Sequence, residues 1–498
     1  MSKLIAAIAS CAIMASNVCA QYNAVDNTYT EVRKLTNGKG KAGDSFGKAV
    51  ASYDDRVLVG APQATSGSTD RSGAAYMYAI ITDYPGFKLV DELASSTPRA
   101  YSEFGCSVAM SANWVIVGAS SDSSSSNSGS ATIFKRVGDY FTTGSENWVV
   151  SDQFFGKAAD EGFGTSVAIS DTGMALVGAP NGNNFEFVIG AGYVAVYSNS
   201  GGSWIQSVIL YADDGSMYDR FGISVAVDQS SVLIGAYNAD EKGFDTGRVY
   251  SYGIVGGLVQ KGDKFKVDGD SDVMDYDMFG QAVALSSTIA AVGCPGDDAV
   301  VPNPYGGVAQ IIGQSNINIG SVHVWVKQSN FNNPYKYKWI WVQEITPGNS
   351  ENMFGSSISL GENVMLIGSR KGGSAYYYSR ADGMSLDPIT QDLMPNKFSL
   401  KRTLTASDGT VQDGFGYAVA MSANSIVVGA PSANGGSTGS GAVYVYRNDK
   451  VSQQSIVSIS SAGFFKNTLA AVGVMTMIGV AAIAAFIAYK HHEQKVRK

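Results

Sequence analysis

The chain has 498 residues, 45% of them hydrophobic and 16% charged, and its formal net charge is −8. Because acidic and basic residues are mixed along the chain, no basic stripe of the kind that binds nucleic acid is present, and we expect no nucleic-acid partner. Only three histidines occur, which argues against His-based nucleophilic catalysis and His-rich zinc sites, so we expect no enzyme.

Residues 1–20 have the composition of a secretory signal peptide. Lys3 supplies the positive charge, residues 4–14 form an apolar core, and residues 18–20 offer a small-residue cleavage site. The apolar run is too short to span a bilayer, which favours a cleaved signal over an N-terminal anchor.

A Phe-Gly pair then recurs seven times, at intervals of 58, 59, 58, 58, 75 and 61 residues. A further glycine follows each phenylalanine by 14 residues, or by 15 in the third copy, and often begins Gly-Ala-Pro. Fixed internal spacing at a fixed period indicates a repeat architecture, in which we expect these positions to be structural. The repeated positions are Phe46, Gly47, Gly60, Phe104, Gly105, Gly118, Phe163, Gly164, Gly178, Phe221, Gly222, Gly235, Phe279, Gly280, Gly293, Phe354, Gly355, Gly368, Phe415, Gly416 and Gly429.

Each unit contains four short runs that are typical of β-strands. A run of small and β-branched residues (166–169 in the third copy) precedes a continuous apolar run (56–59 in the first). An aromatic run (192–197) and an amphipathic run (204–210) follow. The continuous apolar run should be covered on both faces, and the small residues suit a crowded axis. We therefore predict an all-β fold over residues 21–450, a seven-bladed β-propeller of four-stranded antiparallel blades.

The ends of the repeat region suggest how the ring closes. Residues 31–36 resemble a fourth strand and precede the first Phe-Gly, whereas no such run follows Tyr446. We expect the N-terminal strand to complete the last blade. Cys106 and Cys294 would then lie three blades apart, so we expect no disulfide between them.

The unit resembles the FG-GAP repeat, which forms the blades of the integrin α-chain propeller. The resemblance is best where Gly-Ala-Pro is complete, at residues 60–62, 178–180 and 429–431, and it covers roughly residues 30–448. It implies a surface protein that binds its ligand with the loops of one face. Several integrin blades hold calcium in an Asp-rich loop between the first two strands. Here those turns are short, as at residues 52–56, so the resemblance does not extend to that calcium.

The fifth unit departs most from the period, because residues 295–319 lengthen the connection after its second strand. Loops longer than about 12–15 residues are often functional. Strands alternate in direction, so this connection should share a face with the acidic segment 268–277 before the first strand. His323 lies in the third strand of the same unit, where we expect a structural role. We take as candidate ligand-binding residues Asp275, Asp277, Asp297, Asp298 and Tyr305.

The acidic segment also begins like an EF-hand calcium loop, with Asp268, Asp270 and Asp272 as candidate ligands. It lacks the glycine expected at the sixth position and the glutamate expected at the twelfth. Bound Ca2+ is therefore one interpretation and an ordinary solvated acidic loop the other; no other cofactor is expected. Similar patterns at residues 213–219 and 408–413 are typical of turns.

The C-terminal part predicts a membrane anchor. Residues 451–467 form a Ser/Gln-rich stalk, and residues 468–489 a transmembrane helix, since residues 469–489 are uncharged and mostly apolar. The basic tail 490–498 should stay cytoplasmic, which gives a single-pass type I topology. The alternative is a removable C-terminal anchor signal. Small residues in the span would allow it to pair with another membrane protein.

These features predict a membrane-anchored cell-surface binding or adhesion protein that presents a propeller to an extracellular or lumenal protein or glycan ligand. The alternative is a structural subunit of a surface or lumenal membrane complex, which should show an apolar patch on the side of the propeller. A carboxylate-dependent hydrolase is a third interpretation, because aspartate is plentiful.

Overall fold

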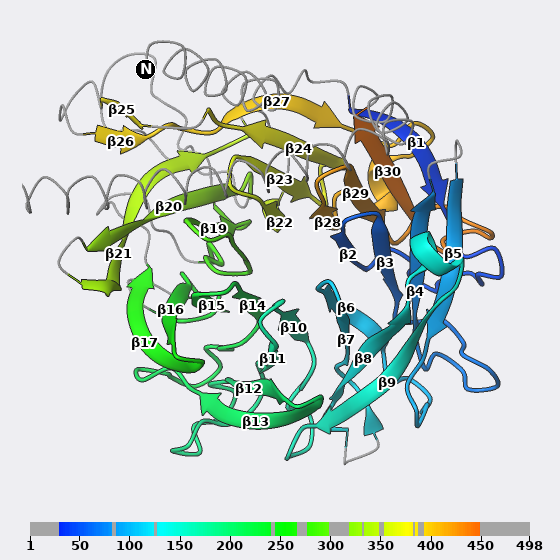
Figure 1. The fold of residues 1–498 in the computed structure, drawn as a ribbon, viewed down its shortest axis with the longest axis horizontal. Coiled ribbons are helices and arrows are strands. Elements are labelled where there is room, and N and C mark those ends of the chain that lie inside the picture. The colour runs from blue at the N-terminus through cyan, green and yellow to red at the C-terminus, as the bar shows by residue number, and fades with distance from the viewer. Residues whose placement is uncertain are drawn as a thin grey trace, which may run out of the picture. The chain divides into compact units, whose positions relative to one another are not determined.

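The computed structural model describes residues 29–448, apart from 82–85, 124–126, 241–244, 266–275, 298–317, 331–332, 348–352, 382–383 and 387–392. In this part of the chain, seven four-stranded antiparallel sheets stand around a common axis, with their first strands nearest the centre (Figure 1). This arrangement confirms the predicted all-β fold of seven four-stranded blades.

The predicted transmembrane helix lies outside the described residues. Across the described ranges, no helix combines the length and apolar character that a bilayer crossing requires. The expected signal peptide, stalk, transmembrane helix and tail lie outside the described residues, so they stay predictions.

The first four blades follow one another in chain order from inner to outer strand. Blade 1 contains β2 (Ala49–Tyr53), β3 (Arg56–Ala61), β4 (Ala74–Ile81) and β5 (Gly86–Leu93). Blade 2 contains β6 (Phe104–Met110), β7 (Trp114–Ala119), β8 (Ser130–Gly138) and β9 (Glu146–Phe155), with the short helix α2 (Tyr140–Thr143) between the last two. Blade 3 contains β10 (Ser166–Ile169), β11 (Met174–Ala179), β12 (Tyr193–Ser200) and β13 (Ser203–Leu210). Blade 4 contains β14 (Ser224–Val227), β15 (Ser231–Ala236), β16 (Arg248–Val255) and β17 (Leu258–Phe265).

The remaining three blades repeat this pattern, with a separate hairpin in blade 6 and a strand from the N-terminus in blade 7. Blade 5 contains β18 (Ala282–Leu285), β19 (Ile289–Cys294), β20 (Ser321–Asn330) and β21 (Asn333–Ile345). Blade 6 contains β22 (Phe354–Leu360), β23 (Val364–Ser369), β24 (Ser374–Ser379) and β27 (Ser399–Leu404), with a separate hairpin of β25 (Met384–Leu386) and β26 (Leu393–Pro395). Blade 7 contains β28 (Ala418–Met421), β29 (Ser425–Ala430), β30 (Ala442–Asn448) and, from the other end of the chain, β1 (Tyr29–Leu35), and the 3-10 turn η2 (Val411–Asp413) precedes it.

The second strand of a blade packs against both neighbouring blades. Every residue of β3 is buried. Val57 and Val59 join a cluster with Val427 of blade 7, whereas Leu58 between them joins Val115 of blade 2. Successive side chains of a strand point to opposite faces, so a continuous apolar run supplies both contacts. Burying each such side chain contributes about 1.5–3 kcal/mol, which makes these layers the main cohesion between blades.

The Phe-Gly pair joins each blade to the blade before it. Phe104 is fully buried, and its backbone N–H donates to the Ser72 carbonyl of blade 1 at 3.1 Å. Gly105 has φ 93°, a left-handed conformation that favours glycine. Its carbonyl oxygen lies 2.0 Å from where a Cβ on Gly60 would stand, and the other six copies approach equally closely, at 2.0–2.1 Å. The repeated glycines therefore let neighbouring blades meet backbone to backbone.

Strand β1 closes the ring at the position that the sequence assigned to residues 31–36. Tyr29 packs on Tyr377 of blade 6, with ring centroids 5.1 Å apart. Leu35 is buried in the cluster that contains Phe46 of blade 1. The Lys34 ammonium also pairs with Asp408 at 2.8 Å. One strand from the N-terminus thus contacts the blades on both sides of the junction.

A buried ion pair links blades 1 and 2. The Arg56 guanidinium on β3 donates two hydrogen bonds to the Glu146 carboxylate at the start of β9, from Nε at 2.9 Å and Nη2 at 2.7 Å. Trp148 Nε1 and the Tyr140 N–H also donate to this carboxylate, at 3.0 and 3.2 Å. Burial alone would raise the pKa of Glu146, but the hydrogen bonds and positive charge of Arg56 lower it overall.

We expect Arg56→Met to lower the free energy of unfolding at pH 7 by about 3–5 kcal/mol, because it leaves a buried carboxylate without its cation. Since the folded-state pKa of Glu146 is depressed, the pair stabilises the fold above the ordinary glutamate pKa of 4.5 and loses this contribution as the pH falls below it. The difference between wild type and variant should therefore shrink in acid. Urea denaturation at pH 7 and pH 4 measures this, with Lys261→Gln as a control that breaks one exposed pair, with Asp213, and costs less than about 1 kcal/mol. A difference that is equal at both pH values would contradict the assignment.

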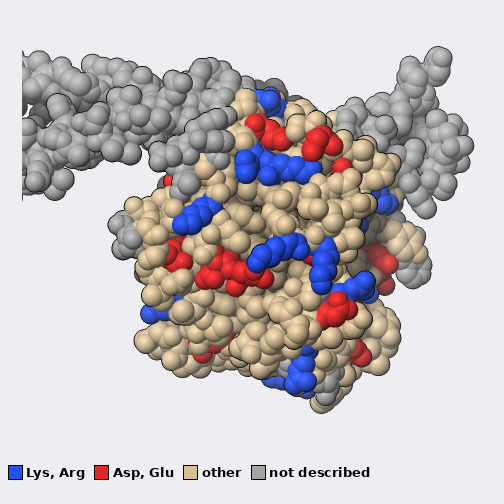
Figure 2. All heavy atoms as spheres, turned by 90° about the vertical axis from the view of Figure 1, so that its right-hand side faces the viewer, with Lys and Arg blue, Asp and Glu red and all other residues tan. Residues whose placement is uncertain are grey.

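The side of the ring that lies on the right in Figure 1 exposes outer strands such as β5 and β9. Lysines and arginines are interspersed there with aspartates and glutamates (Figure 2). This face therefore presents charges of both signs rather than a field of one sign.

Candidate binding face

The connections before the first strand and after the second strand of a blade meet on one face of the ring, called here the loop face. In blade 5 the Gly296 N–H donates to the Asp277 carbonyl at 3.0 Å, and in blade 1 Gln63 bonds Asp44 in the same way at 3.2 Å. The structure thus brings together the two connections that hold the candidate residues Asp277 and Asp297. The other candidates, Asp268, Asp270, Asp272, Asp275, Asp298 and Tyr305, lie outside the described residues, so a calcium site there stays a prediction.

Asp277 belongs to a series of buried acidic residues that stand two positions before a Phe-Gly phenylalanine. Asp44, Glu161 and Asp219 occupy the same position in blades 1, 3 and 4. Each accepts a 2.7 Å hydrogen bond from a backbone N–H three or four residues earlier. Burial raises the pKa of Asp219, and the backbone hydrogen bond from Ser216 partly offsets it. These carboxylates shape the turn into the first strand, and Asp277 stands at the equivalent position in blade 5.

A cysteine, an aspartate and a histidine converge at the base of the connection between β19 and β20. Cys294 ends β19, Asp297 follows it, and His323 stands in β20, with one donor atom from each lying within 4.8 Å of the other two. Cys294 and His323 are buried and Asp297 is half-buried. Sulfur, nitrogen and oxygen donors in this combination can coordinate a transition metal. The sequence pattern indicated a structural role for His323 and did not connect it with Cys294 or Asp297.

Burial keeps two of these groups uncharged. Desolvation lowers the pKa of His323 to about 4, so its imidazole is neutral at neutral pH. Burial, followed by the negative charges of Asp297 and Asp277, raises the pKa of the Cys294 thiol well above its usual range. His323 Nε2 lies 3.1 Å from Ser321 Oγ, whereas Nδ1 has no hydrogen-bond partner among the described residues.

Exposed apolar side chains gather on the loop face at blades 3 and 4, and the sequence did not single them out. Five of them, each more than half exposed, form what is called here the apolar patch: Phe185, Phe187, Ile189, Met217 and Tyr218. The first three lie between β11 and β12, and the other two between β13 and β14. The two segments are joined, because the Tyr218 N–H donates to the Ile189 carbonyl at 3.0 Å. Clustered exposed apolar side chains mark interaction sites.

Hydrogen bonds hold Phe187 outward. Asn184 is buried, and its Oδ1 accepts the N–H groups of Glu186 and Val188 at 2.9 and 3.0 Å. Phe187 itself has φ 62°, an uncommon conformation for a bulky residue, and its side chain is 83% exposed. Strain of this kind persists only where the surrounding structure imposes it, and it gathers at functional sites. The Phe185 ring packs edge-on against Tyr211, with ring centroids 5.7 Å apart.

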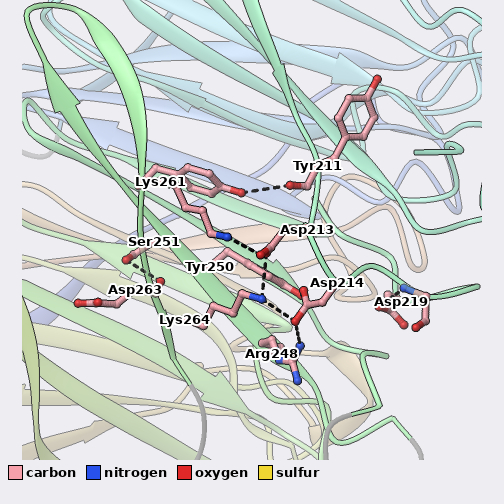
Figure 3. Close-up of polar contacts among 12 residues, drawn as sticks. Tyr211, Asp213, Asp214, Asp219, Arg248, Tyr250, Ser251, Lys261, Asp263 and Lys264 are labelled. Atoms are coloured by element: carbon pink, nitrogen blue, oxygen red, sulfur yellow. Dashed lines mark hydrogen bonds and ion pairs between the residues drawn. The ribbon is translucent and has the colours of Figure 1, made fainter. Parts of the chain in front are cut away.

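Ion pairs fix the segment that holds Met217 and Tyr218. Figure 3 shows the Asp213 carboxylate between Lys261 and Lys264, and Asp214 between Lys264 and Arg248. The Tyr250 hydroxyl also donates to Asp214 at 2.7 Å. Hydrogen bonds from Lys261 and Lys264 lower the pKa of Asp213 to about 2, so these pairs persist at neutral pH. The acidic residues that the sequence assigned to a turn thus anchor the turn to β16 and β17.

Five regions of the chain match a known repeat family. Residues 29–78, 88–134, 204–252, 270–312 and 398–446 match the family model of the FG-GAP repeat. The chain carries FG-GAP repeats. A comparison with curated proteins gave no significant match over the chain.

The FG-GAP repeat is shifted by one strand from the structural blade. The matched region 29–78 begins with β1 and runs into β4, and 398–446 runs in the same way from β27 to β30. Four of the five matched regions therefore contain the outer strand of one blade and three strands of the next, whereas 270–312 contains β18 and β19. This shift explains why β1 must pair with β30. The Phe-Gly pairs at Phe163 and Phe354 lie outside the matched regions and show the same interblade geometry.

A sequence signal for the apolar patch does exist. The connection after the second strand is polar in blades 1, 2 and 7, where Gly, Ser, Thr, Asn and Asp dominate residues 65–72, 120–128 and 432–440. The corresponding connection of blade 3 instead places Phe-Glu-Phe-Val-Ile at residues 185–189. Apolar residues in a segment that should be solvated are the informative exception.

Proposed function

We propose that this chain is a membrane-anchored binding or adhesion protein whose propeller contacts an extracellular or lumenal protein partner through the apolar patch. One observation supports this most: five exposed apolar side chains lie on two joined loops that hydrogen bonds and ion pairs hold in place. Binding energy in protein interfaces concentrates in a few such side chains, and a rigid loop loses little entropy on binding. No catalytic role is proposed.

The anchor belongs to the same proposal. A secretory signal at residues 1–20 and a span at residues 468–489 place the propeller outside the cell or in a lumen. The basic tail 490–498 stays cytoplasmic. Small residues in the span allow it to associate with another membrane protein.

We expect Phe187→Ser combined with Phe185→Ser to weaken ligand binding at least tenfold, because exposed aromatic side chains that become buried contribute about 1.5–3 kcal/mol each. The test uses the full chain displayed on a host cell and measures its adhesion to cells from the same source organism. Leu258→Ser is the matched control. Leu258 is 66% exposed in the hairpin between β16 and β17, on the opposite face. Equal adhesion of wild type and double variant would reject the patch.

Two further arms of this experiment separate the alternatives. Replacing residues 299–316 with a short Gly-Ser linker tests the fifth-blade connection that the sequence favoured. Binding to an array of glycans, lost in the double variant, would assign the patch to a sugar ligand rather than a protein.

A structural subunit is the second candidate, because the outer strands also expose aliphatic side chains. Leu89 on β5, Val149 and Val150 on β9, and Ile205 and Val208 on β13 are exposed, and these strands are neighbours around the ring. An apolar side of this kind suits a permanent partner. If Val149→Ser with Val150→Ser abolishes co-purification of a membrane partner while adhesion persists, the structural role is favoured.

A further inference from the structure

The cluster of Cys294, Asp297 and His323 stands where both ends of the longest connection in the ring meet. Cys294 and Asp297 lie at the start of the segment between β19 and β20, and His323 lies just after its end. We infer that these three residues bind Zn2+, and that the ion ties the two ends of this connection to each other. The inference concerns a site of its own and does not depend on the apolar patch.

The backbone holds the three donors in place without a metal. Cys294 is paired with Ser321 across β19 and β20, which sets the thiol two residues from His323 on the facing strand. Asp297 is fixed by two backbone bonds, from its N–H to the Cys294 carbonyl at 3.2 Å and from the Gly320 N–H to its own carbonyl at 2.9 Å. The ring of His323 packs edge-on against Phe279, with centroids 5.6 Å apart. The site is therefore built from rigid elements.

The donor spacing fits a small ion after a short adjustment. The three donor atoms lie within 4.8 Å of one another. In a tetrahedral zinc site with bonds of about 2.0–2.3 Å, donors stand roughly 3.5 Å apart. Metal binding would require the half-buried Asp297 side chain to turn toward the ion and close the difference. Three protein ligands leave the fourth position for water, as in open zinc sites.

The chemistry of the donors favours a soft or borderline cation over Ca2+, which prefers oxygen ligands. The neutral imidazole offers a nitrogen lone pair without losing a proton, and Nδ1 of this buried ring has no hydrogen-bond partner among the described residues. On binding, the Cys294 Sγ–H bond breaks, the proton leaves to solvent and the sulfur forms the metal bond. Asp277 and Asp297 place negative charge beside the thiol, and a divalent cation would neutralise that charge.

The test is a Co2+ titration of the full chain, purified in mild detergent without a His tag and stripped with a chelator. Cobalt replaces zinc in such sites, and its bond to a thiolate gives a charge-transfer absorption in the near ultraviolet. We expect this band to saturate at one Co2+ per chain and to disappear when one equivalent of Zn2+ is added. Absence of the band in the wild-type chain would overturn the inference, and this result does not depend on any variant folding.

Variants then assign the ligands. Cys294→Ser should abolish the band and Asp297→Asn should weaken Co2+ affinity by about 10–100-fold, whereas Cys106→Ser, which removes the other described thiol, should leave both unchanged. Circular dichroism in metal-free buffer checks that each variant is folded. A band that survives Cys294→Ser, or vanishes with Cys106→Ser, would place the metal elsewhere.

Discussion

Gly235→Ala is expected to lower the free energy of unfolding by about 3 kcal/mol or more, although it adds a single methyl group. A Cβ on Gly235 would stand 2.0 Å from the Gly280 carbonyl oxygen and 2.3 Å from Ser224 Oγ. The first of these is backbone of the next blade, so it cannot move aside without separating blades 4 and 5. The effect is purely steric, because Gly235 does not have a left-handed conformation. Chemical denaturation measures the loss.

The matched control is Gly38→Ala. Gly38 is exposed, and a Cβ there would meet nothing within 4 Å. We expect its effect to stay within about 0.5 kcal/mol. The same clash recurs in all seven blades, so Gly178→Ala should repeat the result of Gly235→Ala. If Gly235→Ala and Gly178→Ala are both as stable as wild type, close backbone contact between blades does not limit the stability of the ring.

Deleting residues 29–35 should have the second large effect. The cooperative unfolding transition should become broad and shift to a lower denaturant concentration. The deletion removes β1, exposes the edge of β30 and strips Tyr29 and Leu35 from the junction between blades. Losing two buried side chains of this size costs about 2–5 kcal/mol each. The uncovered edge strand should also promote self-association, which light scattering detects.

A peptide of residues 27–37 should restore the deleted chain, because it can add the missing strand in trans. A second peptide carrying Tyr29→Ser and Leu35→Ser is the control, and it should fail because it lacks the two buried contacts. A substitution of exposed Arg33 in the full chain should be neutral by comparison. If the deletion leaves the transition unchanged, ring closure by β1 does not stabilise the propeller.

Much of the fold could be predicted because its signals are local and repeated. The continuous apolar run at residues 56–59 implied burial on both faces, and β3 is buried throughout. The missing fourth strand after Tyr446 implied that the N-terminus returns, and β1 pairs with β30. The hairpin of β25 and β26 in blade 6 was not predicted, since it adds to the period instead of following it.

The candidate sites were harder to predict. Acidic residues and loop length drew attention to the fifth-blade connection, yet Asp277 stands where other blades place a turn-shaping carboxylate. The apolar patch depends on Phe187 being turned outward, which follows from the side-chain hydrogen bonds of Asn184. An apolar run gives no such direction by itself, because the same residues could be buried.

The number of blades, their strand order and their manner of closure were determined by the amino-acid sequence alone, because each copy of the motif makes the same contact with the next. Only the tertiary structure decided which side chains from distant repeats meet. Arg56 of blade 1 meets Glu146 of blade 2, and Tyr29 of blade 7 packs on Tyr377 of blade 6. Such encounters depend on the curvature of the ring, which no single repeat encodes.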